Sequence, residues 1–163
     1  MKKIVVLSAV LFTAFTFETH AFGFGVQGGL NVMERLGGFS FLISPNQQTH
    51  GSITWLTGTS EENSGITLAG ALDYWLLSVN LTALGPGALN FFLGGGAYAR
   101  IEAWEEHFGA GAGLRVPFGL DWDVTRFDVF VQIAPLFGLR FLPSPGFDGF
   151  DVDVNIGARI WIG

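Results

Sequence analysis

Between residues 108 and 120 the chain alternates without interruption between two kinds of side chain. In "FGAGAGLRVPFGL" the even-numbered positions are all apolar, and the odd-numbered positions hold glycine, one arginine and one proline. A period of two residues indicates a β-strand, because successive side chains of a strand point to opposite faces. A strand with one face in water would carry charged or hydroxyl side chains where this one carries glycine. The segment therefore does not fit the surface of an ordinary soluble sheet.

The same alternation recurs along the chain and predicts eight strands. Turn signals such as "SPNQQTHG", "LGPGA" and "PSPGFDG" separate the segments. Eight antiparallel strands joined mostly by short turns predict an all-β, up-and-down barrel, because closure removes the exposed edges of an open sheet. The segments are 22–32, 39–44, 52–57, 66–76, 89–101, 108–120, 127–134 and 151–162, of which the second and third alternate only briefly.

The N-terminus has the pattern of an export signal. Two lysines precede an apolar run from Ile4 to Phe17, and Thr19-His20-Ala21 forms a site of small residues at alternate positions. These features are typical of a secretory signal peptide. The run is short for an uncleaved helical anchor, which is the alternative. We therefore expect cleavage after Ala21 and a single domain over residues 22–163.

Composition excludes several classes of protein. The whole chain is 49% hydrophobic and 13% charged, which is too apolar for an ordinary soluble domain. Of its 8 basic and 14 acidic residues, Lys2, Lys3 and Glu18 lie in the leader, so 6 and 13 remain and the expected mature charge is −7. No basic patch remains to bind nucleic acid. The absence of cysteine excludes disulfides and thiolate metal sites, and we expect no metal and no cofactor.

The distribution of side chains between the two faces predicts which face lies inside the barrel. Phenylalanine, leucine, isoleucine and valine dominate one face, whereas glycine, alanine and a few polar residues form the other. The second face cannot solvate a protein, but it can fill the narrow lumen of an eight-stranded barrel. The apolar face would then contact membrane hydrocarbon, which predicts a transmembrane barrel in the bacterial outer membrane.

Two alternatives remain for these apolar segments. A soluble, lipocalin-like barrel would turn the apolar face inward around a ligand. A helical membrane protein would use the long apolar stretch 66–99, although Asp73 and the "GPG" at 85–87 interrupt it. The tryptophans favour the transmembrane barrel, because most lie at or near strand ends and Trp75 a few residues inside one. Such positions are typical of aromatic girdles at the two membrane interfaces. The predicted girdle comprises Trp55, Trp75, Trp104, Trp122 and Trp161.

These features resemble a known family. The export signal, the eight alternating segments and "FGAGAGLRVPFGLDW…FDVFVQIAPLFGLRFLP…FDGFDVDVNIGARIWI" are similar to the small bacterial outer-membrane barrels of the OmpA/OmpX type, particularly uncharacterised members of the kind found in spirochaetes. The resemblance covers the mature chain and implies a structural or surface-interaction role, with no catalytic residues. It also implies outer-membrane lipids and the outer-membrane assembly machinery as partners. The family favours an aromatic residue at the very C-terminus, whereas here Ile162 and Gly163 follow Trp161.

Charged residues inside the predicted strands should form a network in the lumen. Arg115 lies near the middle of its strand, and a charge at that depth on the lipid face would cost about 2–4 kcal/mol. The side chain must therefore point inward, where an unpaired charge is costly. Strand counting places Asp73 and Gln132 near its height and Arg159 near Asp128. The predicted lumen network comprises Arg115, Asp73, Gln132, Arg159, Asp128 and Arg100.

Acidic residues gather in the four loops at the predicted outer end. An anionic rim of this kind can attract a cation or a basic region of an extracellular protein, or it can simply keep the loops solvated. The predicted rim comprises Glu34, Glu61, Glu62, Glu102, Glu105, Glu106 and Asp148, with only Arg35 as a basic residue.

Enzymatic function has little support in the sequence, although some small outer-membrane barrels modify lipids. His107 beside Glu105 and Glu106 could activate a loop serine, Ser60 or Ser64. No motif supports that arrangement, and we predict no catalytic residues and no enzyme. Pro117 and Pro135 interrupt predicted strands, and because proline removes a hydrogen bond between strands, we expect a bulge or a strand end near each.

Overall fold

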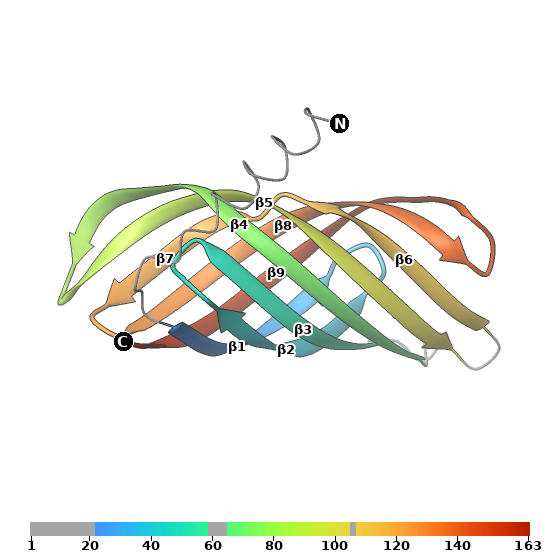
Figure 1. Ribbon diagram of the computed structural model, residues 1–163, viewed down its shortest axis with the longest axis horizontal. Helices are drawn as coiled ribbons and strands as arrows, with labels where there is room; N and C mark the ends of the chain where they lie inside the picture. The colour runs from blue at the N-terminus through green and yellow to red at the C-terminus, as the bar shows by residue number, and fades with distance from the viewer. Residues whose placement is uncertain (1–21, 59–64, 105–106) are drawn as a thin grey trace, which may run out of the picture.

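The computed structural model describes residues 22–58, 65–104 and 107–163. The predicted leader (1–21) and four rim residues, Glu61, Glu62, Glu105 and Glu106, lie outside the described residues. Nine antiparallel strands make up the described chain (Figure 1). They are β1 (Phe22–Asn31), β2 (Leu36–Ser44), β3 (Thr49–Gly58), β4 (Gly65–Leu84), β5 (Gly87–Trp104), β6 (His107–Arg115), β7 (Phe118–Val124), β8 (Phe127–Leu142) and β9 (Gly146–Ile162). The predicted all-β fold is confirmed.

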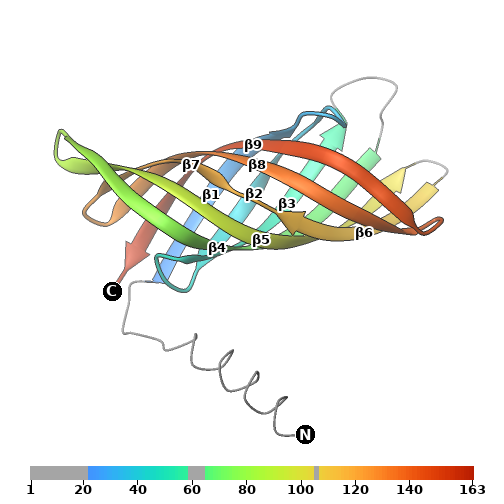
Figure 2. The same cartoon turned by 90° about the horizontal axis from the view of Figure 1, so that it is seen from above.

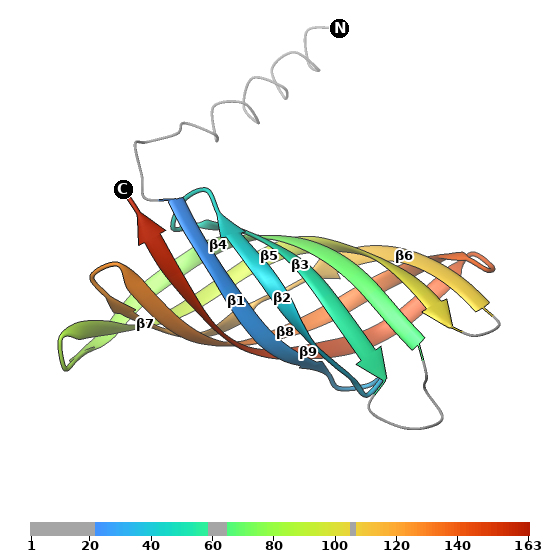
Figure 3. The same cartoon turned by 90° about the horizontal axis from the view of Figure 1, so that it is seen from below.

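The strands close into a ring. Strands that follow one another in the chain pair with each other, except that β6 and β7 both pair with β5 and β8. The ring closes because β1 pairs with β9 from Phe22↔Ile162 to Asn31↔Asp153. The last strand therefore ends beside the start of the first (Figure 3). We call this end of the barrel the terminal end, and the end that carries the turns at 32–35 and 143–145 the loop end. The β4–β5 hairpin extends beyond the ring at the terminal end, and the β8–β9 hairpin extends beyond it at the loop end (Figure 2).

The structure has nine strand segments where the sequence predicts eight, and Pro117 explains the difference. Both β6 and β7 lie between β5 and β8. Their registers are continuous, because Arg115 pairs with Gly96 and Leu136 whereas Phe118 pairs with Leu93 and Ile133. They are two halves of one strand, interrupted where proline has no N–H to donate. The barrel thus has the eight strand positions that were predicted.

Pro135 lies opposite the same interruption. It remains inside β8, and its carbonyl accepts a hydrogen bond of 3.0 Å from the Val116 N–H. Pro135 has no N–H to donate back to Val116. Both prolines therefore remove a hydrogen bond between strands at the same place in the wall. The expected strand end is therefore found at Pro117, whereas the register shift nearest to Pro135 in β8–β9 lies at Gly138/Leu139.

The register also fixes the tilt of the strands. Phe24 pairs directly with Ile160 on β9. Followed the other way around the ring, the pairs run from Phe24 through Ile43, Gly51, Leu72, Ala97, Leu114 and Phe137 to Phe150 on β9. Ile160 and Phe150 are ten residues apart, which is the shear of the barrel. For eight strand positions this shear corresponds to a tilt of about 40°.

The outer wall is apolar, as the alternation predicts. The exposed large side chains include Phe24, Val26, Phe41, Leu72 and Ile156, spread over four strands. Inside the ring lie polar residues such as Gln27, Asp73 and Arg159. Within the described residues there is no helix long and apolar enough to cross a membrane.

Part of the lumen is more apolar than the sequence analysis predicts. Leu42, Trp75, Phe92 and Phe130 form a buried cluster inside the barrel. The Trp75 and Phe92 rings stack with centroids 3.8 Å apart. The small inward residues next to them make the space for these rings. A Cβ at Gly94 would collide with the Tyr74 backbone, and one at Gly157 would collide with the Phe130 ring.

Candidate functional site

The middle of the lumen is organised around Arg115 from β6. Its Nε atom lies 3.2 Å from the Asp73 carboxylate of β4, and its Nη2 atom donates a 3.1 Å hydrogen bond to Gln132 of β8. The Asn155 amide of β9 donates to the same Gln132 oxygen. Arg115 and Asp73 are both almost fully buried. The structure thus brings together Arg115, Asp73 and Gln132, the three residues placed at one height by strand counting.

A second group of residues surrounds Arg159 from β9, closer to the terminal end. The Arg159 Nε donates to both carboxylate oxygens of Asp128, at 3.0 and 3.1 Å. Asp128 also accepts a 2.7 Å hydrogen bond from the Trp161 indole, and Asp121 lies 3.7 Å from Arg159 Nη2. The guanidinium also lies over the Trp75 and Phe130 rings, 4.7 Å from each centroid. Such cation–π contacts favour the charged form in a desolvated site.

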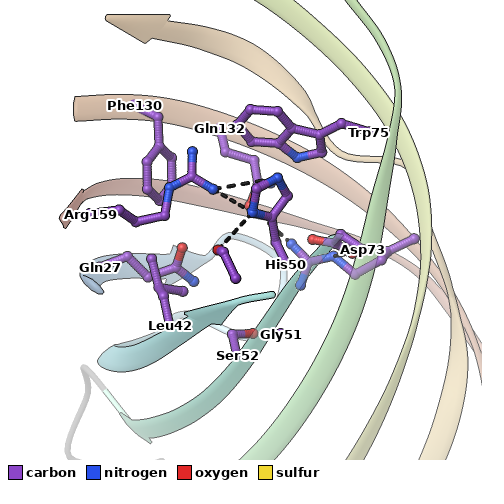
Figure 4. Close-up of a pocket in the computed structure, with 12 residues that line it drawn as sticks. Gln27, Leu42, His50, Gly51, Ser52, Asp73, Trp75, Phe130, Gln132 and Arg159 are labelled. Carbon is purple, nitrogen blue, oxygen red and sulfur yellow. Dashed lines mark hydrogen bonds and ion pairs between the residues drawn. The ribbon is translucent and has the colours of Figure 1, made fainter. Parts of the chain in front are cut away.

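His50 belongs to this group although the sequence analysis does not include it. The predicted third strand begins at residue 52, which leaves His50 in a turn, whereas β3 begins at Thr49 and places His50 opposite Asp73 in the register. The His50 ring is buried, with its centroid 4.1 Å from that of Trp75. Its Nδ1 contacts Arg159 Nη1 and lies 2.8 Å from Ser44 Oγ (Figure 4).

Arg100 of β5 connects the lumen to the predicted acidic rim. Its guanidinium nitrogens lie 2.7 and 2.9 Å from the Glu34 carboxylate oxygens and 2.8 Å from a Glu102 oxygen. The Arg100 Nη2 atom also contacts the Asp148 carboxylate. Burial raises the pKa of the Glu34 carboxyl in the β1–β2 turn, and the Arg100 charge opposes that rise. Three of the predicted rim carboxylates are therefore ion-paired with an arginine that the sequence analysis assigned only to the lumen.

The predicted aromatic girdle is wrong for two of its five residues. Trp75 and Trp161 are 6% and 8% exposed and point into the lumen. Both lie on odd-numbered positions of strands whose even-numbered positions face outward. Their side-chain direction therefore follows the inward–outward alternation of the strand and not their position near a strand end. Trp55 faces outward and stacks on Phe39.

The two remaining girdle tryptophans lie in the wall strands. Trp122 pairs with Leu89 and donates a 3.1 Å hydrogen bond to the Leu84 carbonyl. Trp104 ends β5, and its predicted interfacial position stays a prediction.

Little space remains between these side chains. A cavity of about 20 Å³ lies against His50, Asp73, Trp75 and Arg159 (Figure 4), and one of about 40 Å³ lies between Arg115 and Arg100. Such volumes suit one to a few water molecules, whereas small-molecule sites measure roughly 300–1,000 Å³. Among the described residues, several buried polar atoms around the first cavity have no hydrogen-bond partner in the chain, which also suits water. They include Trp75 Nε1, and also Asp73 Oδ1 and Arg115 Nε, which form an ion pair with each other but no hydrogen bond.

Among the described residues, no cluster of three or more acidic, histidine or cysteine side chains is suited to hold a metal ion. His107 begins β6, and its proposed neighbours Glu105, Glu106, Ser60 and Ser64 lie outside the described residues.

The fold and the lumen define a class of protein, a closed antiparallel β-barrel with an apolar exterior and a charge-paired interior. No family model matches the sequence, and a comparison with curated proteins finds no match. Among solved structures the chain is similar to the N-terminal β-barrel domain of OprF from Pseudomonas aeruginosa. The two share 11% sequence identity with a TM-score of 0.53, over 88% of this chain and 98% of the OprF domain. The likeness supports the barrel fold.

Proposed function

We propose that the mature chain is a small outer-membrane β-barrel protein whose lumen is plugged by its own side chains. The observation that supports this proposal best is the contrast between the apolar outer face and the polar inner face of the closed wall. Large apolar side chains are exposed around the ring while every arginine that points inward near mid-strand has a carboxylate partner. Hydrocarbon is the environment in which such an exterior is stable, because closure satisfies the backbone hydrogen bonds within the wall. The similarity to the OprF β-barrel domain supports the barrel fold on which this proposal rests.

The proposed role is structural or surface-interacting rather than catalytic or pore-forming. The ion pairs of Arg115 and Arg159 cross the lumen from β6 to β4 and from β9 to β8. They brace the wall and block passage of solutes. The partners in this proposal are outer-membrane lipids at the apolar wall and the machinery that assembles outer-membrane barrels. At the loop end, carboxylates not neutralised by Arg100 would present a weakly acidic surface to a cation or an extracellular protein.

Fractionation tests the proposal most directly. The protein should sediment with outer membranes, and its folded form should migrate differently from its heated form on gels. In planar bilayers it should show no large steady conductance at neutral pH. Recovery as a soluble periplasmic monomer would instead favour a lipocalin-like barrel, and solute efflux from liposomes would favour a porin. The lumen volumes of about 20 and 40 Å³ already argue against a lipocalin-like ligand site.

A further inference from the structure

The hydrogen bonds of His50 determine its protonation state. Nε2 lies 3.1 Å from the Gln47 carbonyl oxygen, which can only accept, so Nε2 carries a hydrogen. Nδ1 contacts the Arg159 guanidinium, which can only donate. Nδ1 must therefore present its lone pair, and Ser44 donates to the same atom at 2.8 Å. The imidazole is thus neutral, with its hydrogen on Nε2.

A second proton on His50 is incompatible with this arrangement. It would have to reside on Nδ1, where two donors and two positive charges would then face each other. Arg159 holds two alternative partners, Asp128 at 3.0 Å and the more distant Asp121 at 3.7 Å. Arg159 can therefore move away from His50 toward Asp121 without losing its charge pairing.

The other groups around His50 do not relieve this conflict. Asp73 of β4 faces His50 in the register, but it is already paired with Arg115 of β6. Asp128 and Asp121 of β8 and β7 are paired with Arg159 itself. The remaining neighbours contribute no titratable group. They include Ser44 of β2, Gln47 in the turn, Gln27 of β1 and Trp75 of β4.

We propose that His50 is an acid-sensitive latch at the terminal end of the lumen. The neutral imidazole links β3 to β9 through Arg159, and its protonation releases that link and loosens the plug. The cavity of about 20 Å³ beside His50 has room for a water molecule through which a proton could arrive. The inference rests on the proposed outer-membrane barrel, because only there does a plugged lumen control permeation.

The test compares the pH dependence of unfolding for three proteins refolded into phospholipid vesicles. In the wild type the unfolding equilibrium constant should rise up to tenfold per pH unit below about 6.5, because the unfolded chain binds a proton that the latched state excludes. His50→Asn keeps an acceptor oxygen near the Nδ1 position and cannot titrate. Its unfolding equilibrium constant should therefore lack this rise of up to tenfold per pH unit. His107→Asn removes the other mature-chain imidazole and should behave as the wild type does. Titrating carboxylates act in all three proteins alike.

Permeation and spectroscopy supply independent outcomes. Ion flux through vesicles should increase between pH 7.5 and pH 5 for wild type and His107→Asn, but not for His50→Asn. Should His50→Asn fail to fold, the ¹⁵N spectrum of the wild-type imidazoles decides, since the latch requires a neutral Nε2–H tautomer that persists below pH 6. The latch is refuted if His50→Asn matches the wild type in pH dependence, or if His50 is already protonated at pH 6. Failure of all three proteins to enter vesicles at pH 8 would instead refute the outer-membrane proposal.

Discussion

The ion pair between Arg115 and Asp73 offers the most direct measurement of what the lumen contributes to stability. Their side chains are 5% and 8% exposed and 3.2 Å apart, so each compensates a charge that is removed from bulk solvent. Removing one partner of a buried pair costs about 3–5 kcal/mol, because the other charge stays buried without compensation. Arg115→Ala should fall in this range. Asp73→Ala should cost somewhat less, because Arg115 keeps its hydrogen bond to Gln132.

The double variant isolates the interaction itself. Once one charge is gone, removal of the other relieves an unpaired group, so the double variant should cost about 2 kcal/mol less than the sum of the single variants. Equilibrium urea unfolding in vesicles, followed by tryptophan fluorescence, gives the three free energies. Arg115→Met with Asp73→Leu is the matched apolar pair, and it should be more stable than either single alanine variant. Losses that add to within about 0.5 kcal/mol would show that the two side chains do not interact.

Three further perturbations test other parts of the barrel. Gly119→Ala should prevent the heat-modifiable form on gels, because its Cβ would collide with the Val131 backbone in β8, whereas outward Gly70→Ala should leave that form unchanged, because its Cβ would be 3.8 Å from the nearest backbone atom. Trp161→Phe removes the indole hydrogen bond to Asp128 and should destabilise the barrel by about 1–3 kcal/mol in urea unfolding, and no loss would show that this bond is not formed. Arg100→Ala leaves the Glu34, Glu102 and Asp148 carboxylates unpaired, so calcium should raise its melting temperature more than that of the wild type, and equal shifts with calcium and chelator in both would contradict the pairing.

The strands and their two faces could be predicted from the sequence because both depend on a local property. Alternation places Arg115 and Arg159 inside whatever the rest of the chain does, and the cost of a charge in hydrocarbon then requires partners for them. Even the interruption at Pro117 follows from chemistry within one residue. Fold class and sidedness were therefore accessible before any three-dimensional information.

The composition of the lumen clusters depends instead on register and shear, which are not local. Arg100 meets Asp148, which is 48 residues further along the chain, only because the tilted wall brings β5 and β9 together at the loop end. His50 enters the lumen because β3 begins three residues earlier than its alternation suggests, and "SPNQQTHG" contains no signal for that boundary. Trp75 and Trp161 show the converse error, in which position along a strand was given more weight than parity.

The pairing of β1 with β9 has a consequence for the connectivity of the chain. Since Phe22 lies beside Ile162 in the ladder, a short linker could join these two points without moving any strand. New ends could then be opened in a turn elsewhere in the ring, such as the one at residues 85–86 between β4 and β5. Such a circular permutant would keep every pairing of the wall while changing which strand is synthesised first. In a closed ring, the strand pairings do not depend on which strand is synthesised first. Folding from either starting strand can therefore reach the same closed wall.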